Sequence, residues 1–272
     1  MCIRDRIGYV SLANNHVMDF GFACLEETIN YLKENGISWF GAGRNIKDAK
    51  KPLIVDVNGF KVGFIGFSTV FTPDARATEQ KAGIYGVRVK TTVDIDPKIA
   101  VEEPAAPYMI NGIVLQEDIE ELTSTMNILR NKVDVLIPYV HWGVGLYPYG
   151  EIVLDYVIRL SHDLIDRGAD FIVGTHSHIV QEAAKYKDRV IFYSLGNFLF
   201  YPHMYDMSNI GMIVCYNIKE KFFDLYFLSL EYDELRLLKD LENVYEVMRF
   251  ITKSRRNGVD FTKIKYGFRV ST

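Results

Sequence analysis

Short apolar runs alternate with amphipathic stretches along most of the chain, and this alternation predicts strands and helices in turn. Strands are expected at 7–13, 37–40, 133–140, 170–173 and 190–193. Helices are expected at 22–34, 115–132, 151–167 and 234–253, where apolar residues recur every three or four positions. We therefore expect an α/β layered fold with mixed β-sheets flanked by helices, and a largely parallel sheet at its centre.

Two further regions carry a β pattern. Asn58-Gly59 separates the apolar runs 52–57 and 61–67, and this dipeptide is typical of a two-residue type I′ hairpin. The runs 211–218 and 222–231 are also rich in β-forming residues. The basic, polar tail beyond Arg255 is expected to lie on the surface.

The stretch from Ser68 to about Gly112 shows no periodicity, and Pro, Gly, Thr and charged residues dominate it. A connection of this length inside one domain is typical of a lid or an insert. Arg76 and Arg88 lie within it; contact with an anionic substrate is one reading, and ordinary solvated loop charges are the favoured one.

Composition narrows the class of protein. The 272 residues are 49% hydrophobic and 24% charged, which is typical of a chain that buries a large core. The net charge of −4 and the absence of Lys/Arg blocks disfavour nucleic acid as a partner. Three distant cysteines indicate neither disulfides nor a cysteine zinc site. No apolar run reaches the roughly 18–20 residues of a membrane span, and no signal-peptide pattern opens the sequence.

Four histidines follow predicted strands. They are His16, His141, His176 and His178. Open α/β sheets bind ligands at the carboxyl ends of their strands, so these side chains are expected to gather at one edge. Residues two apart on an extended backbone share a face about 6–7 Å apart, which favours His176 and His178 as ligands of one or two metal ions. A satisfied core or turn histidine is the alternative for each one taken singly.

The remaining histidines do not share this placement. His162 lies at a polar position of a predicted helix and is expected to be solvated, and His203 is a candidate rim residue. Asn15 precedes His16, and the pair offers a neutral oxygen ligand beside a proton donor, which suits hydrolysis of an ester at a metal centre. A capped turn is the alternative. Asn197, in the turn after 190–193, orients either a ligand or its own turn.

Five segments resemble, in order and spacing, the CapA family, which is named for poly-γ-glutamate capsule biosynthesis and is similar to the calcineurin-like metallophosphoesterases. These segments are 11–21, 41–43, 141–143, 174–181 and 193–198. The resemblance covers Ile7 to about Val214, and it implies a layered metallophosphoesterase-like fold.

The resemblance also implies roles for individual residues. Asn15 matches an asparagine metal ligand, His141 and His176 match two ligands of one metal ion, and His178 matches a ligand of the other. His16 matches the catalytic histidine, and Asp19 would orient it. Substrate contacts are assigned to Asn14, Asn197 and Gly143. Two divalent ions, Mn, Fe or Zn, are implied for the complete protein.

The departures from the family pattern are at the amino terminus and beside two motifs. The family's Gly-Asp strand and Asn-Leu-Glu motif, which would supply carboxylate ligands, do not occur before Ile7. We therefore expect residues 1–6 to be a non-native scar and 7–272 to be a single domain that lacks its first strands. Val144-Gly145 and Ala184 stand where the family often has glutamates.

Two functions from different classes remain open. The first is a protein of bacterial capsule or poly-γ-glutamate biosynthesis that acts as a metal-dependent hydrolase or transferase on a phosphorylated small substrate or a polyanionic polymer. The second is a non-catalytic binding component of a membrane-associated polymer-synthesis complex. The resemblance implies an envelope-associated or extracytoplasmic location for the complete protein; the location of this chain stays open.

Overall fold

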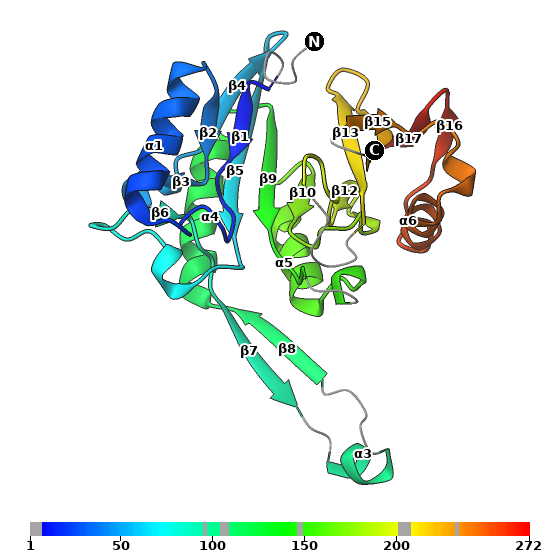
Figure 1. Cartoon of the computed structure of the whole chain (residues 1–272), viewed down its shortest axis with the longest axis horizontal. Coiled ribbons are helices and arrows are strands. Elements are labelled where there is room, and N and C mark those ends of the chain that lie inside the picture. Colours follow the sequence, from blue (N-terminus) through cyan, green and yellow to red (C-terminus); the bar gives the residue numbers. More distant parts are fainter. Residues whose placement is uncertain (1–6, 95–96, 104–108, 146–148, 201–207, 232–233) are drawn as a thin grey trace.

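A six-stranded sheet forms the centre of the molecule (Figure 1). The computed structural model describes residues 7–94, 97–103, 109–145, 149–200, 208–231 and 234–272. The strands of the central sheet, from one edge to the other, are β11 (Ala183–Tyr186), β12 (Arg189–Phe192), β10 (Ile172–Thr175), β9 (Val135–His141), β5 (Phe60–Ser68) and β4 (Leu53–Val57). The inner four are parallel and both edge strands are antiparallel, which confirms the expected mixed sheet.

The predicted hairpin at Asn58-Gly59 is confirmed. Val57 of β4 pairs with Phe60 of β5, so the loop has two residues. Both loop residues have positive φ, 53° and 87°, as a type I′ turn requires. β11, by contrast, was not expected, because its sequence Ala-Ala-Lys-Tyr carries little β signal.

The central strand β9 is largely buried on both faces. In β9, Val135 and Ile137 face one hydrophobic core, whereas Leu136 and Val140 face another. Successive side chains of a strand point to opposite faces, so a strand between two cores is apolar throughout. This explains why the sequence run 133–140 lacks polar alternation.

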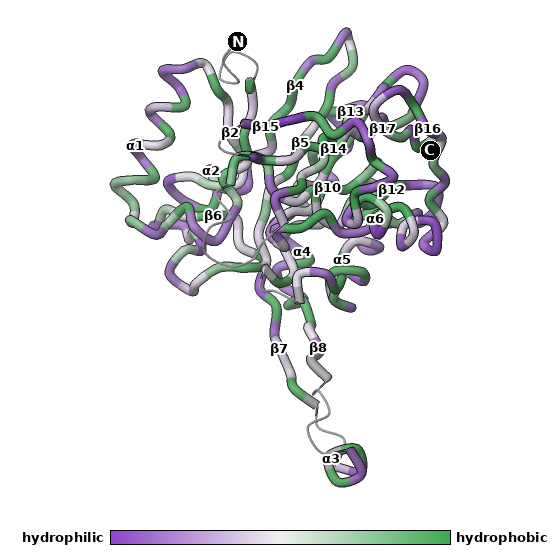
Figure 2. Tube along the Cα trace, turned by 45° about the vertical axis from the view of Figure 1, so that its right-hand side comes forward, coloured by the Kyte–Doolittle hydropathy of each residue, from purple (hydrophilic) through white to green (hydrophobic). Residues whose placement is uncertain are grey.

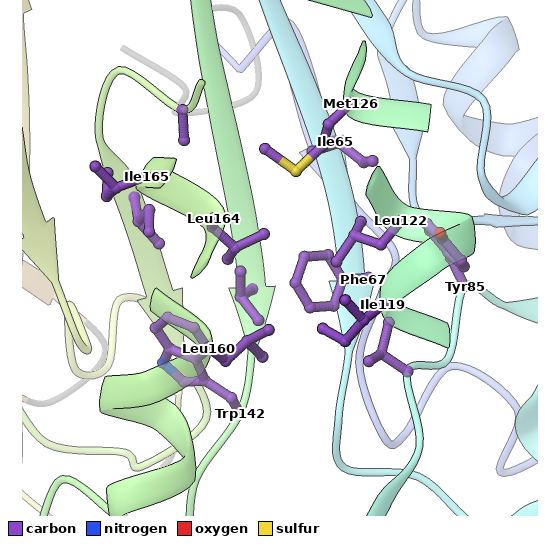
Figure 3. Close-up of a cluster of buried hydrophobic side chains, with 14 of the residues drawn as sticks. Ile65, Phe67, Tyr85, Ile119, Leu122, Met126, Trp142, Leu160, Leu164 and Ile165 are labelled. Carbon is purple, nitrogen blue, oxygen red and sulfur yellow. The ribbon is translucent and has the colours of Figure 1, made fainter. Parts of the chain in front are cut away.

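Two amphipathic helices cover one face of the sheet. They are α4 (Gln116–Arg130) and α5 (Asp155–Asp166). Figure 3 shows Leu122 and Met126 of α4 near Ile65 of β5, and Leu160 of α5 near Trp142. The apolar stripe of each helix therefore has the sheet as its partner.

A second, antiparallel sheet faces the other side. It consists of β13 (Ile210–Asn217), β14 (Phe222–Glu231), β17 (Gly267–Ser271) and β16 (Thr262–Ile264), with β15 (Glu234–Leu237) paired to β14. α6 (Tyr245–Arg256) and the 3-10 turn η4 (Leu241–Asn243) pack with it, and the shared core includes Phe223, Phe227 and Phe250. Figure 1 shows this sheet and α6 on the right of the molecule.

Two expectations for the carboxyl-terminal part are wrong. Residues 234–237 form a strand, and the last helix begins at Tyr245, because Leu235 and Leu237 alternate with charged residues and pair with β14. The tail beyond Arg255 is not a surface segment throughout. Phe268 and Val270 of β17 are buried against the second core.

The amino-terminal part forms a smaller layer around α1 (Gly21–Glu34) (Figure 1). β1 (Tyr9–Ser11) and β2 (Ser38–Phe40) pair in parallel, β3 (Ala42–Gly43) pairs with β6 (Gly83–Ile84), and α2 (Ile46–Ala49) follows β3. Leu25 and Ile29 of α1 pack with Leu12 and Ile84 in a third core. The run 41–43 is thus partly a strand.

The stretch 68–112 is not structureless. It contains the 3-10 turn η2 (Pro73–Ala75), strand β6, and a hairpin of β7 (Val89–Asp94) and β8 (Met109–Val114) with α3 (Pro97–Glu102) between them. Figures 1 and 2 show this hairpin projecting from the body of the molecule as an arm. A two-stranded ribbon has no large apolar face, which is why its sequence carries weak periodicity.

Arg76 and Arg88 are not simply solvated loop charges. Both guanidinium groups contact Asp118, a buried residue in the first turn of α4, at 3.3 and 2.7 Å. These ion pairs tie the 68–88 segment to α4. His162 is likewise not simply solvated, since its ring stacks on Tyr186 with centroids 3.8 Å apart.

Among the described helices, none is long and apolar enough to cross a membrane. His203 and residues 1–6 lie outside the described residues.

Candidate active site

The site forms where neighbouring parallel strands end. His141 is the last residue of β9 and pairs in register with Thr175, the last residue of β10. His176 follows directly, so the rings of His141 and His176 have centroids 4.6 Å apart. The loop after β1 brings Asn15 and His16 to the same place, and the expected gathering of strand-end histidines is observed in the structure.

Five side chains form one continuous chain of hydrogen bonds. Asp19 Oδ2 lies 2.8 Å from Nδ1 of His16, whose Nε2 lies 3.1 Å from Nδ2 of Asn15. Oδ1 of Asn15 lies 2.8 Å from Nε2 of His141, and Nδ1 of His141 lies 3.1 Å from Oγ1 of Thr175. These hydrogen bonds join the loop after β1 to the ends of β9 and β10.

The donors in this chain follow from its chemistry. The carboxylate of Asp19 only accepts, so Nδ1 of His16 donates to it and Nε2 accepts from the Asn15 amide. With the His141 proton on Nε2, the Asn15 oxygen accepts from it. With the proton on Nδ1, that nitrogen donates to the Thr175 hydroxyl, which itself donates to the Val140 carbonyl at 3.3 Å, and Nε2 keeps its lone pair. The His16 side chain is 70% exposed, so this end of the chain can meet a substrate.

His176 and His178 lie on a loop, not on an extended strand. β10 ends at Thr175, and the two histidines have φ of 100° and 60°. The sequence argument from extended geometry was therefore wrong, although the ring centroids are 6.1 Å apart. Positive φ is costly for residues other than glycine, typically about 1–3 kcal/mol, and such strain is common at functional sites.

Asn197 fixes the orientation of His178. Nδ1 of His178 lies 2.9 Å from Oδ1 of Asn197, while Nδ2 of Asn197 donates to the carbonyl groups of His178 and Ser208. Because that amide nitrogen donates to carbonyls, its oxygen accepts from His178 and leaves Nε2 with a lone pair. The turn at 194–198 thus positions a histidine.

Burial keeps two of the imidazoles neutral. Burial, with smaller contributions from the neighbouring histidines, lowers the pKa of His141 to about 3. The same causes lower the pKa of His176 to about 4. Neutral imidazole is the form that binds metal ions, because protonation removes the lone pair.

The backbone beneath the histidines is tightly packed. A Cβ at Gly174 would overlap the carbonyl oxygen of Tyr193 and the indole nitrogen of Trp142. The same indole nitrogen donates to that carbonyl at 2.9 Å. Only glycine therefore allows β10 to pass this close to its neighbours.

The residues assigned to substrate contact have structural partners as well. Oδ1 of Asn14 accepts from the backbone nitrogen of His16 at 2.9 Å, which shapes the turn. The backbone nitrogen of Gly143 donates to the Tyr156 hydroxyl at 2.9 Å. Their substrate contacts stay predictions.

Several residues of the site were missed from sequence. Thr175 is hydrogen-bonded to His141, and Tyr156 is hydrogen-bonded to Gly143. The ring of Phe200 lies against that of His178, with centroids 4.5 Å apart. Arg249 of α6 donates to the Val180 carbonyl at 3.0 Å and pairs with Glu151 in the 3-10 turn η3 (Tyr149–Glu151). Thr175 adjoins the His-x-His motif, but nothing local in the sequence indicates Arg249.

The donor chemistry of the site suits a divalent ion. Nδ1 of His176 is buried and has no hydrogen-bond partner within the described part of the chain. Nε2 of His178 and the Asn15 oxygen are further donors, and so is Nε2 of His141 in the tautomer whose Nδ1 donates to Thr175. Within the described ranges, no three His, Cys, Asp or Glu side chains form a group that could hold an ion, so the amide oxygen of Asn15 is part of the set we consider.

Comparison with known proteins places this site in a family. The model of the bacterial capsule synthesis protein PGA_cap family matches residues 3–202, which include every residue of the candidate set. The chain belongs to this family. The carboxyl-terminal sheet and α6 lie outside the matched PGA_cap region.

Two curated relatives carry capsule or polymer names. The chain is 26% identical over 257 residues to the capsule biosynthesis protein CapA of Bacillus anthracis, covering 93% of this chain and 55% of that protein. It is 28% identical over 189 residues to the PGA biosynthesis protein CapA of Bacillus subtilis strain 168, covering 69% and 41%. The chain thus spans about half the length of these two curated relatives.

Solved structures show a weaker likeness. A putative 5'-nucleotidase from Staphylococcus aureus matches with a TM-score of 0.41 and 14% identity, covering 85% of this chain and 36% of that one.

Proposed function

We propose that this protein is a metal-dependent phosphoester hydrolase or transferase in the synthesis of a capsule polymer. The observation that carries the proposal is the hydrogen-bonded chain from Asp19 through His16 and Asn15 to His141. It links an exposed histidine, which can exchange a proton with a substrate, to a buried set of neutral metal donors. The names of the Bacillus relatives support the capsule context.

Asn15, His141 and His176 would hold one ion, and His178 would contribute to a second. When bound, the ions supply positive charge that stabilises a phosphoryl group and the oxygens that enter and leave it. Thr175 and Asn197 orient His141 and His178, so these rings are fixed before an ion arrives.

His16 would supply the proton. Asp19 holds Nδ1, which aims Nε2 away from the carboxylate and would stabilise the ring once Nε2 has taken up a proton in place of its contact with Asn15. Hydrolysis would then break the bond between phosphorus and the leaving oxygen, with water supplying the new oxygen. His16 would give its proton to the leaving group, and the proton released from the water would return His16 to its starting state.

Turnover of phosphomonoesters and phosphodiesters with Mn²⁺ tests the proposal. His176→Ala should lose turnover, whereas His162→Ala, on the outer helix α5, should keep it. Absence of turnover in the unmodified protein would overturn the proposal and favour the non-catalytic binding role.

A further inference from the structure

Exposed apolar side chains border the histidine site on two loops. Phe198, Leu199 and Phe200 follow Asn197 directly and are 42%, 57% and 40% exposed. Phe20 follows Asp19 directly and is 84% exposed. We call these four residues the apolar rim. Single exposed apolar residues are ordinary, but three in a row beside a polar site are not.

The Phe198–Phe200 part of the rim adjoins the site, and Phe20 is next to Asp19 in the sequence. The Phe200 ring lies 4.5 Å from the His178 ring, and Asn197 holds His178 through its Nδ1. Asp19 holds His16 in the same way at the other loop. Any molecule that reaches both His16 and His178 therefore meets exposed apolar surface next to the residues that bind it.

The size of the rim favours a small occupant. Four such side chains expose on the order of 400 Å², since one aromatic residue offers about 150–250 Å² in full. A stable protein interface needs about 800 Å² from each partner. An alkyl chain of about eight carbons covers on the order of 250 Å², from the area that one methylene buries. A protein seated here would also block the histidines.

We propose that the site takes an anionic amphiphile, a phosphate ester whose alkyl or prenyl chain lies on the apolar rim. This inference rests on the proposed function, because the phosphate is placed at the histidine site. It narrows the substrate class from phosphorylated molecules in general to those with a lipid-like chain.

Calorimetric binding of methyl phosphate and octyl phosphate in the presence of Mn²⁺ tests the inference. Octyl phosphate, below the concentration at which it forms micelles, should bind at least about tenfold more tightly, because each buried methylene adds affinity. The double variant Phe198→Ser/Leu199→Ser should lose this difference and keep its affinity for methyl phosphate. Ile128→Ser, at a position of α4 with the same 57% exposure as Leu199, should keep the difference.

Equal affinity for the two compounds, binding of neither, or a preference that survives the double variant would each overturn the inference. So would a dimer of the unmodified protein that the double variant dissociates, since a second copy would then cover the rim. Hydrolysis without any chain preference would overturn the inference alone. A clear preference in binding without hydrolysis of any ester would instead overturn the catalytic proposal.

Discussion

Asn15 Oδ1 lies 2.8 Å from Nε2 of His141, and this contact joins residues 126 positions apart. The loop after β1 thereby closes over the end of β9 at the centre of the parallel sheet. The Asn15 amide also reaches His16, so one side chain connects the buried imidazoles with the exposed one. A change at Asn15 should therefore affect both halves of the site.

Asn15→Leu keeps the branched shape and the number of side-chain heavy atoms and removes both polar atoms. Mn²⁺ affinity should fall by about 10–100-fold or more, because a donor is lost and His141 loses its partner. Titration calorimetry measures this fall. Asn127→Leu, at an exposed position of α4, is the matched control and should bind Mn²⁺ as the unmodified protein does. Unchanged affinity in Asn15→Leu would remove Asn15 from the donor set.

Asp19→Asn keeps an oxygen that accepts from Nδ1 of His16 but removes the negative charge. Turnover should fall by about 10–100-fold, because the protonated ring loses its stabilising partner. Mn²⁺ affinity should not change, since Asp19 lies at the opposite end of the hydrogen-bonded chain from His141. Steady-state kinetics and metal binding, measured on one preparation, separate the two effects. A parallel loss of both would show a structural role instead.

Gly174→Ala should destabilise the protein by about 1–3 kcal/mol or more, because the new methyl group overlaps Tyr193 and Trp142. Urea denaturation gives this value. Gly8→Ala is the control, since a Cβ there has no neighbour within 4 Å, and it should change stability by less than about 0.5 kcal/mol. Equal stabilities of the two variants would contradict the close packing under the site.

Asp118→Asn tests how the 68–88 segment is held. Burial alone would raise the pKa of Asp118, but hydrogen bonds from Arg88 and the charge of Arg76 outweigh it, and the net pKa is lowered from 3.8. A carboxyl group whose pKa is lower in the folded state than in the unfolded state stabilises the fold at pH values above its unfolded-state pKa. This stabilisation is lost as the pH falls through the folded-state pKa.

The variant should therefore be less stable by about 2 kcal/mol near neutral pH, a value reduced for the partial exposure of Arg88. The difference should shrink between about pH 5 and pH 2. Urea denaturation of both proteins across this range measures it, and a difference independent of pH would contradict the charge argument.

Much of the site could be predicted because parallel strands end at one edge. His141 and His176 follow apolar runs that are easy to find, and strand pairing then brings them together. The backbone at His176 could not be predicted, since its positive φ comes from the packed loop and not from its own preference.

Prediction of the rest of the fold failed where residues pair over long distances in the sequence or where the local sequence pattern is weak. Nothing in the sequence around Arg88 indicates its partner Asp118, which is 30 positions away. Arg249 donates to the Val180 carbonyl from α6, a helix outside the residues that the PGA_cap model matches. The sequence around β17 is basic and polar. The burial of Phe268 and Val270 could therefore be recognised only from the structure, in which β14 pairs with β17.

Pulsed electron paramagnetic resonance of bound Mn²⁺ tests the central claim most directly. The account predicts bound Mn²⁺ with nitrogen couplings from histidine in the full protein, and a loss of couplings and affinity in His176→Ala but not in His162→Ala. Bound Mn²⁺ without histidine nitrogen couplings, or no bound Mn²⁺ at all, would contradict it.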